Sequence, residues 1–321
     1  MGNLKFSSEK PYPLPESAAA TFGAVMRRWL TFISAERKHS TYIKYKNICG
    51  NYLMPFSDLK LADRYMEEAE RLLCLSLKGK SCSLRKNVYT VFNQILKYAR
   101  EYCGSEIKFK AASPKGAGRV RVEIFSQSEQ ARLLRYLSAG TDIYKAGILL
   151  CLSTGLRLGE ICSLKWSDID MDMRILHVNS TVQRIEARGH ETKTILMESE
   201  PKSIYSKREI PLSDAVIAML KNMPRKGRYF LCAGRPMEPR TYQNKLKSYL
   251  KSAGVDGKNF HTLRHTFATN CVNTGADIKS ISEILGHADV KITLNRYVHP
   301  TIDTKRSHMN RLSALYDQIT E

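Results

Sequence analysis

The sequence predicts a mainly α-helical chain of two domains, of which the second also contains a small antiparallel β-sheet. Three observations support this fold class. Apolar residues recur at helical spacing through residues 21–103, a stretch rich in glycine, small and basic residues follows at 104–122, and β-branched residues concentrate in two later runs, 175–185 and 207–212. A length of 321 residues also fits two domains.

The first domain, 21–103, is predicted to be a bundle of four helices. Apolar side chains at three- and four-residue spacing mark the first, second and fourth helices, and a third covers about 64–76. Ser40 and Ser81 are placed to cap the second and fourth helices. Basic side chains lie between and opposite the apolar stripes, where we expect contacts to phosphate. These candidates are Arg27, Arg28, Lys44, Lys46, Arg85 and Lys86.

The stretch 104–122 is predicted to be a flexible, positively charged linker. Its further candidate phosphate contacts are Lys115, Arg119 and Arg121. The second domain, 123–300, opens with a capping box of Ser126 and Glu129, and its apolar helix is expected to end at Gly155. Helical patterns after the β-rich part cover 213–223, 239–252, 262–274 and 277–285. The chain ends are an N-terminal extension, 1–20, and a C-terminal tail helix, 301–321.

Charge is the strongest compositional clue to a partner. Fifty-one lysines and arginines against 31 acidic residues leave a net charge of +20, which is divided about equally between residues 1–118 and 119–321. Two positive bodies joined by a linker suit a polyanion, of which nucleic acid is the first candidate. A cationic protein without such a partner is the alternative. Apolar runs are too short for a membrane span, and the N-terminus has no signal segment, so we expect a cytoplasmic location.

Two classes of metal site are disfavoured by spacing. The eight cysteines form no CxxC pair, which argues against a zinc site and against a disulfide framework. His261 and His265 stand four residues apart, but the glutamate of a zinc protease is missing between them. Asp168, Asp170 and Asp172 alternate as metal ligands do, yet the glycine and glutamate of a calcium loop are absent. A turn is the favoured interpretation of these aspartates, with a metal site as the alternative.

Reactive residue types concentrate in four segments, which are 154–160, 201–212, 261–269 and 285–297. Their arginine, lysine, histidine and tyrosine residues suit attack on a phosphodiester. Arg157 and Arg264 can neutralise the charge that grows on the non-bridging oxygens. Lys202 can protonate the leaving alkoxide, and His261 can help a tyrosine to lose its proton. A phosphotyrosine ester keeps the energy of the broken bond, so that resealing needs no ATP.

Three of these segments, TGLRLGE, HTLRHTFAT and LGHADVKITLNRY, resemble the motifs of the tyrosine recombinases, the phage-integrase superfamily of site-specific DNA recombinases. The resemblance covers roughly 120–300 well. It extends more weakly to 20–103, which is similar to the core-type, SAM-like DNA-binding domain of that family. The wording of the last segment looks most like integrases of phages and conjugative transposons.

The resemblance implies roles for individual residues. Arg157 and Arg264 would clamp the scissile phosphate, and Tyr297 would form the 3′-phosphotyrosyl link. Lys202, on the turn between two strands, would be the general acid toward the 5′ oxygen. His261 would act as general base or acid for the nucleophile.

Three further residues complete the predicted site. His287 would hydrogen-bond the phosphate, and Glu160 would hold the arrangement together from behind. His265 is expected to be structural, although it shares a motif with His261. Lys193 and Lys207 are the alternatives to Lys202, because both lie in the same β-rich region.

The resemblance also implies partners. Double-stranded DNA with specific recombination sites would be bound by a homotetramer that acts through a Holliday junction, with no cofactor. An accessory excision factor or a host DNA-bending protein is a further possible partner. The amphipathic stretch 304–319 would pack on a neighbouring subunit or on its own domain. About 20 residues precede the first helix, too few for an arm-binding domain, so the chain is either a minimal two-domain recombinase or a shortened one.

Integration or excision of a mobile element is therefore the expected function. The alternatives within the family are DNA inversion, dimer resolution, and a catalytically silent DNA-binding regulator. Outside it stand a type IB topoisomerase, which shares the chemistry, and a metal-dependent nuclease built on the three aspartates.

Overall fold

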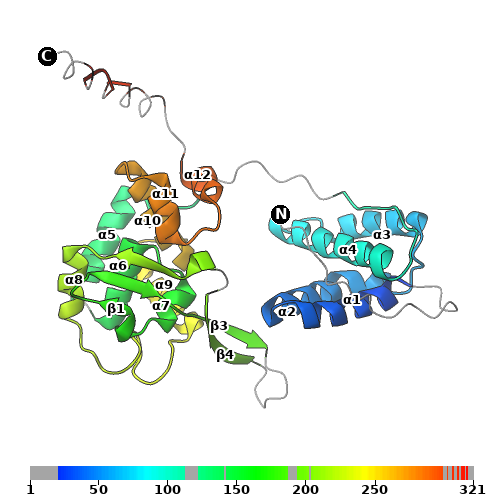
Figure 1. The fold of residues 1–321 in the computed structure, drawn as a ribbon, viewed down its shortest axis with the longest axis horizontal. Coiled ribbons are helices and arrows are strands. Elements are labelled where there is room, and N and C mark those ends of the chain that lie inside the picture. Colours follow the sequence, from blue (N-terminus) through cyan, green and yellow to red (C-terminus); the bar gives the residue numbers. More distant parts are fainter. Residues whose placement is uncertain are drawn as a thin grey trace. The chain divides into compact units, whose positions relative to one another are not determined.

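Helices dominate the computed structural model, which describes residues 21–112, 122–140, 142–186, 194–201, 204–298 and eight positions between 302 and 316. The chain divides into two compact units, Met1–Val120 and Arg121–Glu321 (Figure 1). Each unit has its own hydrophobic core. The predicted fold class, mainly helical with a small antiparallel β part, is confirmed. No helix in the described ranges is long and apolar enough to cross a membrane.

The first unit is a helical bundle. Its helices are α1 (Phe22–Glu36), α2 (His39–Ile48), α3 (Asp63–Ser76) and α4 (Cys82–Tyr102), and α2 continues into two short turns, Cys49–Leu53 and Met54–Phe56. Ser81 caps α4 as predicted, accepting a hydrogen bond from the Leu84 amide. The prediction for Ser40 is wrong. The helix starts earlier because the Lys38 carbonyl already accepts from the amides of Thr41 and Tyr42, so Ser40 lies in the first turn.

Residues 105–112, predicted to be part of a flexible linker, instead pack on the first unit. The Asp63 carboxylate accepts the backbone amides of Lys108 and Phe109, both at 2.9 Å. The Asn93 side-chain amide pairs with both backbone groups of Ala111, at 2.9 and 3.0 Å. An extended segment has unpaired backbone donors, and these two polar side chains satisfy them. Lys115, Arg119 and Arg121 lie outside the described residues.

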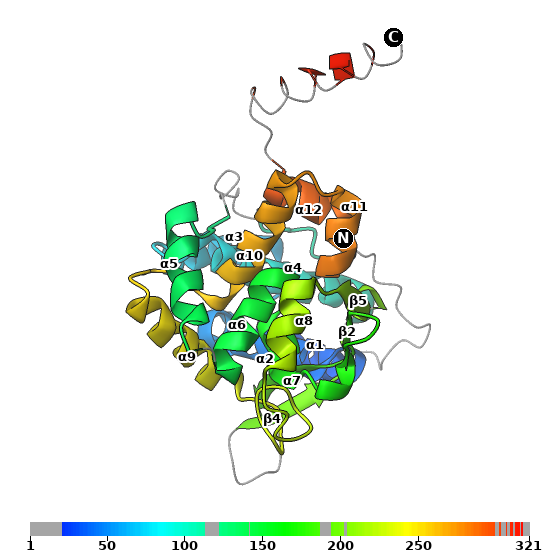
Figure 2. The same cartoon turned by 90° about the vertical axis from the view of Figure 1, so that its left-hand side faces the viewer.

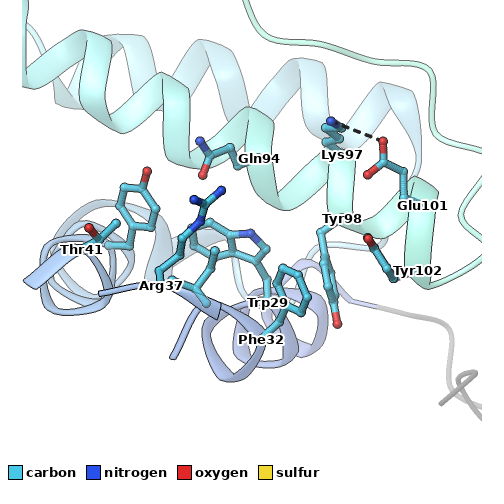
Figure 3. A pocket seen from close by; sticks show the side chains of 11 residues that line it. Trp29, Phe32, Arg37, Thr41, Gln94, Lys97, Tyr98, Glu101 and Tyr102 are labelled. Carbon is cyan, nitrogen blue, oxygen red and sulfur yellow. Dashed lines mark ion pairs between the residues drawn. The ribbon is translucent and has the colours of Figure 1, made fainter. Parts of the chain in front are cut away.

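A pocket of about 290 Å³ lies between α1, α2 and α4 (Figure 3). Aromatic rings line it, among them Trp29, which stacks on Tyr45 with centroids 5.4 Å apart. The side chain of Arg37 extends toward Gln94 of α4. The pocket lies in the first unit, whereas the reactive motifs all lie in the second.

The second unit surrounds the apolar helix α6 (Ile143–Thr154). Helix α6 packs against α5 (Gln127–Ser138), α8 (Asp214–Lys221), α9 (Pro239–Ser252) and α10 (Phe260–Asn273) (Figure 2). The predicted capping box is present at the start of α5, where Ser126 and Glu129 each accept the other's backbone amide. The described ranges of this unit also contain α7 (Leu158–Ser163), α11 (Ile278–Leu285) and α12 (Val290–Tyr297).

In the part of the chain that the structure describes, five short strands form two antiparallel sheets, whereas the sequence predicted one small sheet. One sheet has the order β1-β2-β5 (Ile169–Asp170, Ile175–Val178 and Arg208–Pro211), and β3 (Thr181–Glu186) pairs with β4 (Thr194–Ser199). The β-rich run 175–185 is therefore divided between β2, in one sheet, and β3, in the other. Side-chain hydrogen bonds of two polar residues account for the break. Asn179 donates to the Asp168 carboxylate at 3.0 Å, and the Ser180 hydroxyl donates to the Ser163 carbonyl at 3.3 Å.

The turn between β1 and β2 accounts for the alternating aspartates. Asp170 accepts the backbone amides of Asp172 and Met173, at 3.0 and 2.8 Å, and thereby closes the turn. Asp168 accepts the Lys165 amide at 3.0 Å besides its bond from Asn179. The interpretation of these residues as turn formers is confirmed.

Candidate active site

The predicted site is assembled at the ends of several elements of the second unit. The predicted residues that the structure describes lie at the N-terminus of α7, on one face of α10, in the turn after α11 and at the last residue of α12. In Figure 1 α10, α11 and α12 lie together, and each packs against the other two. The predicted residues brought to these positions are Arg157, Glu160, His261, Arg264, His287 and Tyr297. Lys202 and its alternative Lys193 fall outside the described residues.

Gly155 ends α6, as predicted, and lets two elements meet at the site. Its φ of +66° is a left-handed conformation that favours glycine. A Cβ at this position would stand 2.6 Å from Phe267 Cδ1 and 2.9 Å from Leu285 Cδ2, closer than atoms pack. The Gly155 carbonyl is thereby turned toward α10, where it accepts a hydrogen bond from Arg264 Nη1 at 2.8 Å.

Glu160 orients Arg157 from within the same turn of helix. Its Oε2 accepts the Arg157 amide at 2.8 Å, and its Oε1 accepts Arg157 Nη1 at 2.7 Å. The other terminal nitrogen, Nη2, donates to the Gly286 carbonyl at 3.1 Å. The Arg157 side chain keeps 35% exposure, against 3% for Glu160. The guanidinium is therefore fixed in direction, yet one side of it is open to a ligand.

Arg208 is a site residue that the sequence motifs did not indicate. At the start of β5, both terminal nitrogens of Arg208 donate hydrogen bonds to the Glu160 carboxylate, at 3.1 and 2.9 Å, and its Nε donates to the Ile284 carbonyl. Its side chain is only 5% exposed. A period of two places Arg208 on the inward face of the strand with the buried Ile210, and that alternation is the signal that could have found it.

Burial alone would raise the pKa of Glu160, but Arg208 and Arg157 outweigh it and lower the pKa to about 2. A carboxylate with an ordinary pKa near 4.5 when unfolded therefore stabilises the fold above that pH, and this contribution is lost as the pH falls toward 2. The shift corresponds to about 3 kcal/mol.

We expect the unfolding free energy of the protein to fall by about 3 kcal/mol more than that of E160Q between pH 5 and pH 2, since glutamine cannot titrate. Chemical denaturation at a series of pH values measures this. The exposed Glu209 provides the control, because E209Q should follow the wild-type curve. Parallel curves for E160Q and the wild-type protein would show that the three groups do not form the ion pairs described.

Arg264 is the deeply buried cation of the site, with 2% of the residue exposed. It donates to the Gly155 carbonyl and, at 2.5 Å, to the Leu285 carbonyl. Burial first, and then the nearby Arg157, lower its pKa to about 9. It remains charged at neutral pH, and an anion arriving beside it would replace part of the hydration that burial has removed.

Tyr297 ends α12 with its ring buried in a small apolar cluster that includes Phe267, Ile281 and Leu285. Its hydroxyl lies 2.7 Å from Nδ1 of His265. From the motifs, His265 was expected to be structural and His261 to have the proton-transfer role. A sequence motif cannot show which of two histidines one helical turn apart faces a residue on another helix.

The other two histidines flank this pair. The ring of His261 meets that of His265 edge-on, with centroids 4.4 Å apart. The ring of His287 lies parallel to that of Tyr297 at 6.5 Å, and its Nδ1 is 2.9 Å from the Thr293 hydroxyl. Gly286, just before it, approaches β5 closely, since a Cβ there would stand 3.1 Å from Arg208 Cδ.

Burial and positive charge together keep the histidines neutral at pH 7. Loss of water around the ring, and then neighbouring arginines, lower the pKa of His287 to about 3. Burial and then His261 lower the pKa of His265 to about 4, and the pKa of His261 is lowered as well. Burial raises the pKa of Tyr297, while Arg264 and Arg296 act in the opposite direction. Arg296, which was not among the predicted site residues, affects all four groups.

The predicted phosphate contacts of the first unit differ in exposure. Arg27, Lys44, Lys46 and Lys86 are exposed, and Lys44 also donates to Asn87 at 2.8 Å. The two others, Arg28 and Arg85, are partly buried. At the other end of the chain, the described positions of the predicted tail helix are helical, and Met309, Leu312 and Tyr316 among them are exposed.

Comparisons with known proteins identify relatives of this chain. The model of the phage integrase family matches residues 123–303, more than half of the chain. The chain is 28% identical to a XerC-like tyrosine recombinase of Caldanaerobacter subterraneus subsp. tengcongensis, a match that covers 92% of this chain and 83% of that protein. It is also 28% identical to the transposase from transposon Tn916 of Enterococcus faecalis, over 59% of this chain and about half (51%) of the transposase.

A solved structure shows the same fold. The integrase of transposon Tn1549, in complex with a circular intermediate DNA, superposes with a TM-score of 0.72 and 20% identity, covering 91% of this chain and 99% of that one. The motif order, the assembled site and the family match over 123–303 lead to one conclusion. The chain belongs to the phage integrase family, the tyrosine recombinases.

Proposed function

We propose that this protein cuts and rejoins double-stranded DNA at specific sites through a 3′-phosphotyrosyl link on Tyr297. One observation carries the proposal. The hydroxyl of Tyr297 is held 2.7 Å from a neutral histidine, and Arg264, Arg296 and Arg157 all act on its pKa. A phenol beside a proton acceptor and a cluster of guanidinium groups is equipped to attack an anionic phosphodiester.

Arg157 and Arg264 take the role of a clamp on the scissile phosphate. Both are already oriented by hydrogen bonds, Arg157 by Glu160 and Arg264 by the Gly155 and Leu285 carbonyls. Neither therefore has to reorganise when charge grows on the non-bridging oxygens. His287 adds a hydrogen bond to the phosphate. As Tyr297 Oη bonds to phosphorus, the bond to the 5′ oxygen breaks, and Lys202 supplies the proton to that leaving oxygen.

Rejoining is the reverse reaction. A 5′ hydroxyl of the partner strand attacks the phosphotyrosine, Tyr297 leaves, and the DNA backbone is restored without an external energy source. Family membership supports two rounds of this exchange within a homotetramer, so that a Holliday junction forms and is resolved. Glu160 and Arg208 hold the arginine clamp in place through both rounds.

Integration and excision of a mobile element is the biological reaction that we propose. The relatedness to the Tn916 transposase and the shared fold with the Tn1549 integrase support it. Dimer resolution is the second candidate, because a XerC-like recombinase matches over 92% of the chain. The DNA products separate the two. A circular element with rejoined ends identifies excision, whereas conversion of a plasmid dimer to monomers identifies resolution.

The basic face of the first unit and the arginines of the second would bind the DNA backbone. The net charge of +20 is shared by both parts, so we expect many phosphate contacts and a strong dependence on salt. Affinity should fall by about 10³–10⁵-fold between about 50 and 200 mM salt if six to ten phosphates are contacted. Fluorescence anisotropy on a labelled duplex measures this, and a shallow salt dependence would contradict backbone binding on this scale.

Covalent capture tests the proposed chemistry and maps the cleavage position in the same experiment. Short nicked duplexes that tile the DNA on both sides of the gene are incubated with the protein, the mixture is denatured in detergent, and the DNA that remains attached is sequenced. We expect adducts at one or a few positions, each through a 3′ phosphate. The reaction should persist in excess EDTA, whereas EDTA would inhibit a metal-dependent nuclease. Free cut ends without adducts would overturn the proposal.

A further inference from the structure

Two histidines on α10 compete for the role of proton acceptor toward Tyr297. His261 and His265 are one helical turn apart on the same face, and their rings touch. His265 is the inner one, and its Nδ1 lies 2.7 Å from the Tyr297 hydroxyl, a normal hydrogen-bond length. His261 is exposed, and its ring contacts the ring of His265.

We propose that His265, rather than His261, is the general base that removes the proton from Tyr297 during cleavage, and the acid that returns it during rejoining. This inference rests on the proposed function. In the cleavage step the Tyr297 Oη–phosphorus bond forms while the bond from phosphorus to the 5′ oxygen breaks. The phenolic proton passes to Nδ1 of His265, which must carry its own proton on Nε2 beforehand. The electron pair of the broken bond stays on the 5′ oxygen, which Lys202 protonates.

The surroundings of His265 fit this assignment. Its pKa of about 4 keeps the imidazole neutral at pH 7, so that a ring nitrogen is able to accept a proton. After burial, the groups that lower this pKa are His261, Arg296 and Arg264. A scissile phosphate among them would offset their charge and make the imidazolium easier to form. The phenol becomes acidic only as its oxygen bonds to phosphorus, which places the proton transfer in the transition state.

The position of His261 suits a different task. An exposed ring at the N-terminus of α10 can meet a phosphate from solvent, and the helix end favours negative charge there. Loss of His261 would therefore weaken phosphate contact, whereas loss of His265 would remove the acceptor next to the nucleophile.

The test uses the full-length protein and a duplex that carries a bridging sulfur in place of the 5′ oxygen at the mapped cleavage position. The leaving thiolate needs no acid, so a defect in protonating the leaving group disappears, but a defect in activating Tyr297 persists. We expect H265N to form adducts about 10²–10⁴-fold more slowly than the wild-type protein on this substrate. Asparagine is close in shape and can accept the hydrogen bond, but it is not a base. H177N, on a partly exposed histidine of β2, is the matched control.

Chemical rescue gives the second readout. H265A removes the ring, and added imidazole should restore part of the adduct rate, which a packing role would not allow. Circular dichroism confirms that each variant is folded, and H265N carries the test should H265A unfold. A wild-type rate for H265N, or a large loss confined to H261N, would overturn the inference. Failure of the wild-type protein to form any adduct would instead overturn the proposed function.

Discussion

The Y297F variant is expected to form no covalent adduct with DNA, while its affinity for the same duplex stays near the wild-type value. The substitution removes one oxygen, the atom that would attack phosphorus. The ring remains and fills the same cluster with Phe267, Ile281 and Leu285. Losing the hydrogen bond to His265 costs about 1 kcal/mol, too little to unfold the domain. Detergent-resistant adducts on a nicked duplex and mobility shifts on an intact one measure the two quantities.

Y136F serves as the matched control, because Tyr136 is a partly buried tyrosine of the same unit that packs against Tyr249 on α9. It should cleave as the wild-type protein does. Adducts at the wild-type level in Y297F would refute the assignment of the nucleophile. Loss of DNA binding together with cleavage would point to a structural role for the hydroxyl instead.

How far the sequence predicted this site depends on the kind of signal. Arg157, Arg264 and Tyr297 were predicted because each stands in a motif whose order and spacing resemble a family. Helices in the second unit were predicted from apolar periodicity, and Gly155 was correctly expected to end one of them. These signals are local, and a single chain displays them without its fold.

The residues that were missed act across the fold. Arg208 stands 48 positions from Glu160, and nothing in the sequence of β5 indicates that Glu160 is its partner. His265 and Tyr297 are 32 positions apart on different helices, so their hydrogen bond depends on how α10 and α12 pack. The incorrect prediction of a flexible linker at 105–112 has the same cause. Its composition predicted flexibility, but Asp63 and Asn93, earlier in the chain, supply the acceptors and donors that hold it.

R157K is the second substitution for which we expect a large loss, a fall in adduct formation of about 10²–10³-fold or more. Lysine keeps the positive charge but lacks the planar, forked arrangement of N–H donors that arginine has. Arg157 uses one terminal nitrogen on Glu160 and the other on the Gly286 carbonyl, and this pair of contacts aims the guanidinium. An ammonium group cannot hold both contacts and still present two parallel donors to a phosphate. Single-turnover cleavage with saturating DNA separates this loss from any change in affinity.

Arg71 offers a matched control, because it also pairs with a glutamate three residues away, Glu68, but on the surface of α3 with 71% of its side chain exposed. R71K makes the same chemical change where no phosphate chemistry is expected, so its cleavage rate should equal that of the wild-type protein. If R157K cleaved equally fast, positive charge alone would be enough at this position. The fixed fork held by Glu160 and Gly286 would then be a structural feature without a catalytic role.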